Sequence, residues 1–87
     1  MVSAVVLLNT DSDAQNEVVD NLRLIDGVEE AHALYGVYDL LVKVRAKNID
    51  ELKTVTKSRI KQVAGVTSSL TLVLHDGDKE MPHIGSP

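Results

Sequence analysis

The chain of 87 residues contains no cysteine, no phenylalanine and no tryptophan. Without cysteine, a disulfide framework, a zinc–thiolate site and thiol catalysis are excluded. The apolar stretch near the N-terminus follows no basic segment and is too short for a signal peptide or a membrane span, so we expect a cytoplasmic protein that does not contact membranes. The net charge of −4 opposes direct binding of nucleic acid.

Aromatic residues are also scarce, because the only two are Tyr35 and Tyr38, in the sequence Tyr35-Gly36-Val37-Tyr38-Asp39. Aromatic side chains are usually spread through a core because each buries a large area. Here they gather at one corner, where Gly36 permits a tight turn or a positive φ and Asp39 adds a carboxylate. Two interpretations stand: a site for a small zwitterionic ligand, or a β-hairpin whose tyrosines cover the edge of a sheet.

A repeat with a spacing of 38 residues organises the chain. Residues 25–34 align with residues 63–72, and a Gly-Val pair coincides in both, at Gly27 and Gly65. Each stretch is typical of a helix end, a glycine in the left-handed conformation and then a strand. The repeat therefore predicts two copies of one supersecondary unit.

Apolar residues at helical spacing precede each glycine. The expected stripes are Ala14, Val18, Leu22 and Ile25 in the first half, and Ile49, Leu52, Thr56, Ile60 and Val63 in the second. Residues 12–15 have the form of a capping box, and Asn48 is the expected N-cap of the second helix. Strand-like runs, residues 4–8 and 40–46, come before the two helices.

This order, β-α-β twice, predicts an α+β ferredoxin-like βαββαβ fold over residues 1–75. Its four-stranded antiparallel sheet has the order 4-1-3-2, with two helices on one face. Residues 76–87 contain proline and glycine without apolar periodicity, and we expect a flexible tail there. The spacing of His75, Asp76, Asp78 and His83 matches no established ligand motif, so we expect no metal and no cofactor.

The face of the sheet opposite the helices is expected to be mixed. The third strand sends Leu41, Lys43 and Arg45 to that face, and the last strand sends Leu70, Leu72 and Leu74 to one side. Such a face is too apolar for open solvent, and packing against a second copy about a two-fold axis would cover it. Glu29 and Glu30 are expected to pair with Lys43 or Arg45 across strands or across subunits.

Several function classes that use this fold are disfavoured. The central strands carry no aromatic residue to stack bases, as an RNA-recognition motif would require. The basic residues Lys47, Lys53, Lys57, Arg59 and Lys61 are interspersed with acidic ones, which is typical of a solvated helix face. His32 is expected mid-strand, without an obvious nucleophile or acid partner. Catalysis is therefore the weaker class, and we expect a protein that is not an enzyme.

The residues resemble a known family. Gly36-Val37-Tyr38-Asp39, the apolar strand that follows, and Gly65-Val66 with Thr71 five residues later are similar to the effector domain of Lrp/AsnC (feast/famine) transcription regulators, called RAM. The resemblance covers Ala4 to about Leu74. It implies dimers formed through the sheets, often assembled further, with amino acids bound in clefts at subunit contacts.

By the same resemblance, the ligand-binding residues are Tyr35, Gly36, Val37, Tyr38, Asp39, Ser69 and Thr71. Amides around Gly36 could bind a carboxylate, Asp39 could pair with an ammonium, and the hydroxyls could complete the shell. Tyr35 stands where the family often has a small hydroxyl residue, which narrows the pocket.

The family's regulators carry an N-terminal winged helix-turn-helix, whereas this chain starts at its first strand. We therefore expect a stand-alone amino-acid-sensing module that forms a homodimer or larger homo-oligomer, with full-length Lrp/AsnC regulators as candidate partners. Two alternatives stay open: a ligand-free structural partner of such regulators, and a small dimeric α+β barrel enzyme.

Overall fold

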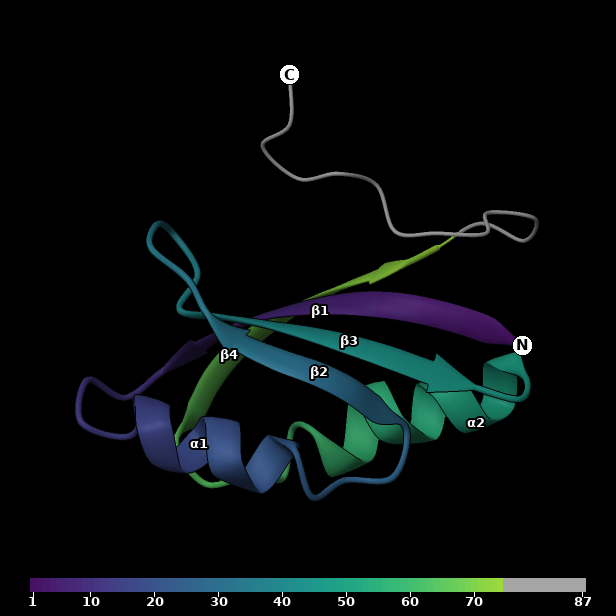
Figure 1. Ribbon diagram of the computed structural model, residues 1–87, viewed down its shortest axis with the longest axis horizontal. Helices are drawn as coiled ribbons and strands as arrows, with labels where there is room; N and C mark the ends of the chain where they lie inside the picture. The colour runs from purple at the N-terminus through teal and green to yellow at the C-terminus, as the bar shows by residue number, and fades with distance from the viewer. Residues whose placement is uncertain (75–87) are drawn as a thin grey trace.

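The computed structural model describes residues 1–74, drawn in colour in Figure 1. The predicted tail, with its His and Asp residues, lies outside the described residues. The elements are β1 (Val2–Thr10), α1 (Gln15–Leu22), β2 (Val28–Ala33), β3 (Leu40–Ala46), α2 (Ile49–Thr54), the π-helical segment η1 (Val55–Arg59) and β4 (Val66–Val73).

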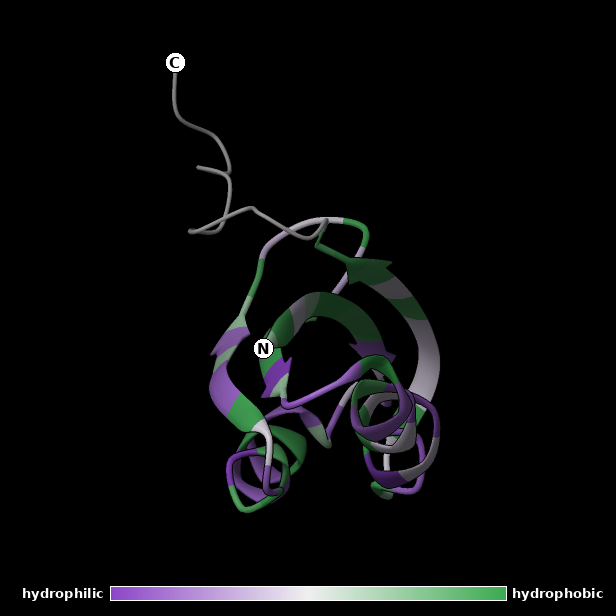
Figure 2. Ribbon diagram, turned by 90° about the vertical axis from the view of Figure 1, so that its right-hand side faces the viewer, coloured by the Kyte–Doolittle hydropathy of each residue, from purple (hydrophilic) through white to green (hydrophobic). Residues whose placement is uncertain are grey.

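The strands form one antiparallel sheet in the order β2-β3-β1-β4. This is the predicted order 4-1-3-2, and it confirms the ferredoxin-like fold. Both helices lie against the same face of the sheet, as Figure 2 shows at the bottom of its view. The opposite face, called the open face below, carries no helix among residues 1–74.

The core between sheet and helices is aliphatic. Strand residues that alternate toward the helices are fully buried, such as Val6 in β1 and Val42 in β3. The other members of this cluster are Ala4, Leu8, Val18, Val19, Leu22, Ala31, Leu40, Val44, Ala46, Leu52, Val55 and Ile60. The core therefore contains no aromatic side chain, and both tyrosines lie outside it, in residues 35–39.

The predicted helix signals are confirmed in part. Asn48 caps α2, with its Oδ1 accepting the Glu51 N–H at 2.8 Å, as predicted. The predicted capping box at residues 12–15 is wrong: α1 begins after Ala14 without a side-chain cap. Ile49 was expected in the buried stripe but is 44% exposed. It opens α2, and a first-turn side chain points back beyond the N-terminal end, past the edge of the core.

The second helix changes its period at η1. The Ile60 N–H donates to the Val55 carbonyl at 3.0 Å, a π-type bond that adds one residue to the turn. The Thr56 hydroxyl, buried as predicted, donates to the Leu52 carbonyl at 3.0 Å. The buried position of Val55 was missed, because a strict stripe through Thr56 leaves it out.

The repeat is realised as two interlocked halves. Gly27 and Gly65 end the two helical segments with φ of +99° and +97°. Each glycine carbonyl accepts a hydrogen bond from the other half of the chain: Gly27 from the Arg45 N–H at 2.8 Å, and Gly65 from the Asp11 N–H at 2.9 Å. The two glycine turns therefore tie the halves together at equivalent points.

Candidate functional site

The open face has an apolar half on β1 and β4. By the strand register, Val5 lies between Leu72 and Lys43, and Leu7 lies between Leu70 and Leu41. Val5 is only 5% exposed, whereas Leu72 at the sheet edge is 48% exposed. Together with Val5, the neighbouring Leu7, Leu41, Leu70 and Leu72 form a continuous apolar strip. Nothing within residues 1–74 covers this strip.

The other half of the open face, on β2 and β3, is charged. Lys43 Nζ lies 3.6 Å from Glu29 Oε1, and Arg45 Nη1 lies 3.4 Å from Glu29 Oε2, which confirms the expected cross-strand pairs. The expectation that His32 has no acid partner is wrong, because His32 Nε2 lies 2.9 Å from Glu30 Oε1, two residues along the same exposed face of β2. The hydrogen bond from His32, assisted by the charge of Lys43, lowers the pKa of the Glu30 carboxyl.

The corner, residues 35–39, joins β2 to β3 and rises from the sheet on the side away from the helices (Figure 1). Tyr35 and Val37 are exposed almost completely, Tyr38 is half-buried, and Gly36 has a φ of +145°. Gly36 thus adopts the positive φ that the sequence allowed. Because Tyr35 and Val37 project from their own chain, they are free to contact something outside it.

Asp39 already has a role within the chain. Its Oδ2 accepts the Thr10 N–H at 2.9 Å, and its own N–H donates to the Leu8 carbonyl at 2.8 Å. The Asp39 carbonyl accepts from the Leu34 N–H at 2.8 Å and from the Gln15 side chain at 2.9 Å. These bonds fix the base of the corner to the end of β1 and the start of α1.

We therefore expect Asp39→Ala to lower the free energy of unfolding by about 1–3 kcal/mol without any ligand, because the half-buried Thr10 N–H loses its acceptor. Asp39→Asn keeps an acceptor oxygen and should lose about 1 kcal/mol or less. Chemical denaturation of the two variants checks this order. Equal stability of wild type and Asp39→Ala would contradict the bracing role.

Ser69 and Thr71 lie on the helix-side face of β4, opposite Leu8 and Val6 of β1. Leu8 also carries the carbonyl that holds the Asp39 N–H. The corner and the start of β4 are therefore at the same end of the sheet, separated by β1, two strand spacings or roughly 10 Å apart. Within one chain, the exposed corner residues and Ser69 do not meet, since the corner rises on the other side of the sheet.

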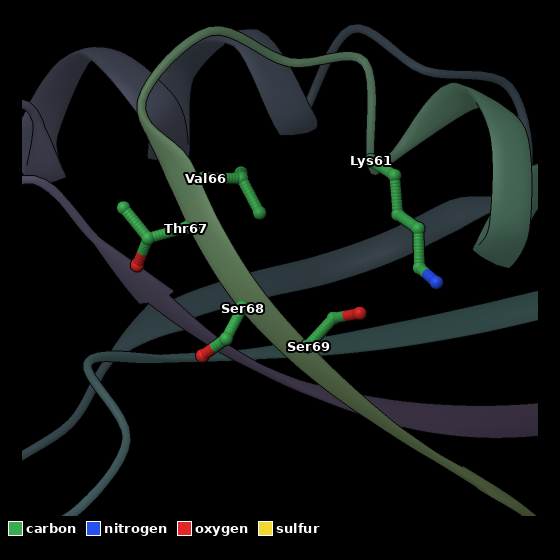
Figure 3. Close-up of a pocket in the computed structure, with 5 residues that line it drawn as sticks. All are labelled: Lys61, Val66, Thr67, Ser68 and Ser69. Atoms are coloured by element: carbon green, nitrogen blue, oxygen red, sulfur yellow. The ribbon is translucent and has the colours of Figure 1, made fainter.

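A pocket of about 320 Å³ opens beside the start of β4, lined by Lys61, Val66, Thr67, Ser68 and Ser69. In Figure 3 the Lys61 ammonium and the Ser69 hydroxyl point toward one another from opposite walls. The Thr67 and Ser68 side chains point to the other side of the strand, where Ser68 Oγ accepts from Asn9 Nδ2 at 3.0 Å.

Of these lining residues, the sequence pointed only to Ser69. Lys61 is exposed, as the interpretation of a solvated face predicts, but it lies beyond η1 in the turn that leads to β4 and lines the pocket. The signal that could have found it is the 38-residue repeat, which aligns Lys61 with Arg23.

Residues 1–74 show neither a metal centre nor a membrane-spanning helix. No group of three or more His, Asp or Glu side chains there could hold a metal ion. Neither helical segment is long and apolar enough to cross a membrane.

The fold and the pocket define a small α+β domain with a candidate ligand site at one end of its sheet. The model of the Lrp/AsnC ligand binding domain matches residues 3–82. The chain therefore belongs to the Lrp/AsnC ligand-binding domain family, as the corner and the Gly65-Val66 pattern indicated.

Curated relatives place this domain in two settings. An uncharacterised HTH-type transcriptional regulator of Pyrococcus abyssi is 35% identical over 81 residues, which cover 90% of this chain and 54% of that protein. The chain thus spans about half the length of the regulators it matches. A homocitrate synthase of Saccharolobus islandicus is 38% identical over 71 residues, 80% of this chain but only 15% of that enzyme.

Solved structures share the fold. The protein solved as FFRP-DM1 has a TM-score of 0.82 and 29% identity, covering 86% of this chain and all of its own. Escherichia coli AsnC gives 0.80 and 25%, covering 95% of this chain and 56% of its own. A transcriptional regulator from Neisseria meningitidis, solved as an L-Met complex, gives 0.77 at 18% identity, covering 99% and 55%; at that identity it supports the fold alone.

Proposed function

We propose that this domain binds a free amino acid at a contact between copies of the chain and passes that signal to a regulatory partner, without catalysing a reaction. The observation that carries the proposal is the position of the exposed corner at the same end of the sheet as the polar start of β4. Membership in a ligand-binding domain family supports it.

The need for a second copy follows from the placement of the corner. The corner rises on the side of the sheet away from the helices (Figure 1), whereas Ser69 and Thr71 lie on the helix-side face of β4. The exposed Tyr35 and Val37 can therefore line a site with Ser69 and Thr71 only across a subunit contact. The apolar strip on the open face gives a surface through which such copies can pack. Ligand binding and assembly should then depend on each other.

We expect one or a few of the twenty amino acids to raise the Tm of the purified chain. A ligand at 100 times its Kd stabilises a domain by about 2.7 kcal/mol, or about 10 °C or more at this size. A thermal-shift screen, followed by calorimetric titration, checks this. Binding of none of the twenty would contradict the proposal and favour the ligand-free structural alternative.

A second candidate function is control of a biosynthetic enzyme, favoured by the match of 71 residues to a homocitrate synthase. Both candidates share amino-acid binding and differ in the partner. Adding the purified chain, with and without its amino acid, to an HTH-type regulator in a DNA-binding assay tests the first. Adding it to a homocitrate synthase activity assay tests the second, and an effect in only one assay assigns the partner.

A further inference from the structure

The two halves of the internal repeat differ at the residue that follows each helix and faces the edge of the sheet. A shift of 38 residues aligns Arg23 with Lys61, and Ala31 with Ser69. In the first half, Arg23 Nη2 donates to the Ala31 carbonyl at 2.8 Å, so the side chain that leaves the helix end covers the free edge of β2. In the second half, a shorter lysine stands in that place and the pocket lies between it and β4.

The main chain of Ser69 faces this pocket. The Leu8 carbonyl accepts the Asp39 N–H, so the peptide groups of Leu8 point toward β3. In an antiparallel pair, a residue whose peptide groups point away from its partner forms a non-hydrogen-bonded pair, and Leu8 pairs with Ser69. The N–H and C=O of Ser69 therefore point outward, at the free edge of the sheet.

A β-bulge adds to the opening. Asn9 pairs with Ser68 and Thr10 pairs with Val66, so Thr67 is an extra residue without a partner in the register. Bulges bend a strand and re-aim its groups, and they are common next to binding sites. Within residues 1–74, the start of β4 is thus an edge that is covered neither by another strand nor by a side chain placed like that of Arg23.

We propose that this gap is a carboxylate pocket in which Lys61 binds the α-carboxylate of a free amino acid; the inference rests on the function proposed above. The Ser69 N–H and hydroxyl donate to the same carboxylate, and the Ser69 carbonyl accepts from the α-ammonium. The N–H and C=O of one strand residue are spaced like the main-chain groups of one amino acid, as in the addition of a strand to a sheet edge. Val66 supplies an apolar wall.

The test compares the ligand found in the thermal-shift screen with its carboxamide, which is neutral at that end. Lys61→Met should weaken binding of the amino acid by about tenfold or more, since a charge-assisted bond is lost. The same variant should bind the carboxamide as wild type does. Lys57→Met is the matched control: it removes an equal charge from an exposed position in η1 and should leave the affinity unchanged.

Lys61→Arg tests the gap itself. The longer side chain should donate to the Ser69 carbonyl as Arg23 does to Ala31, so binding should fall about tenfold although the charge is kept. Wild-type affinity in Lys61→Met or in Lys61→Arg, or an equal loss for acid and carboxamide, would overturn the carboxylate pocket and leave amino-acid binding intact. If wild type binds none of the twenty amino acids, both proposals are wrong.

Discussion

Gly65→Ala is expected to lower the Tm by about 10 °C or more. Gly65 has a φ of +97°, and a Cβ built there would lie 2.9 Å from both Ala14 Cβ and Val18 Cγ2. The left-handed backbone costs an alanine about 1–2 kcal/mol, and overpacking of this kind costs about 1–3 kcal/mol. For a domain of this size, each kcal/mol lowers the Tm by roughly 4–8 °C. A thermal melt followed by circular dichroism measures the loss.

The repeat supplies the control. Gly27 has nearly the same φ, +99°, but a Cβ there would meet Val55 Cγ2 at 3.1 Å and the Arg45 carbonyl at 3.4 Å. Gly27→Ala therefore carries the same backbone cost with a milder contact and should lose less stability. A loss in Gly27→Ala equal to or greater than that in Gly65→Ala would show that packing against α1 is not what makes Gly65 sensitive.

The fold could be predicted from the sequence because several local signals agreed. The glycine turns, the apolar stripes before them and the alternation in the strands all required two βαβ units, and such units can interleave in few ways. The errors lie where one signal stood alone. The capping box at residues 12–15 had no second feature to support it, and the π turn at η1 depends on tertiary packing rather than on local propensity.

The site was less predictable than the fold. The corner was located because its composition is unusual, and its exposure agrees with a role in contacts outside the chain. The partner of the Asp39 carboxylate, the Thr10 N–H, could not be read from the sequence, because the two residues are 29 positions apart. Lys61 was missed because charge patterning indicates only that a lysine is exposed, which Lys61 is. The pocket beside Lys61 becomes evident only when this residue is compared with Arg23, which bonds to the strand edge in the other half of the repeat.

Leu72→Glu is expected to convert an assembled wild type into monomers. Leu72 lies on the apolar strip of the open face, opposite Val5. A two-fold contact through that strip would bury the introduced charge twice per dimer, with no partner, and burying an unpaired ion costs several kcal/mol. The dimer dissociation constant should rise by about 100-fold or more. Sedimentation velocity at micromolar concentration measures this dissociation constant.

Val6 is unsuitable for this test, because it is fully buried against the helices and a charge there would unfold the chain.

The adjacent residue separates assembly from folding. Val73 is 56% exposed, close to the 48% of Leu72, but it lies on the helix-side face of β4, opposite Ala4. Val73→Glu therefore adds the same charge to the same strand and should leave the assembly unchanged. Both variants should keep the strand and helix signal of wild type in circular dichroism, since neither side chain is part of the core. Two outcomes would show that the open face is not the contact between copies: a wild type that sediments as a monomer, or dissociation by Val73→Glu and not by Leu72→Glu. In either case the corner meets Ser69 of another copy through a different contact or not at all.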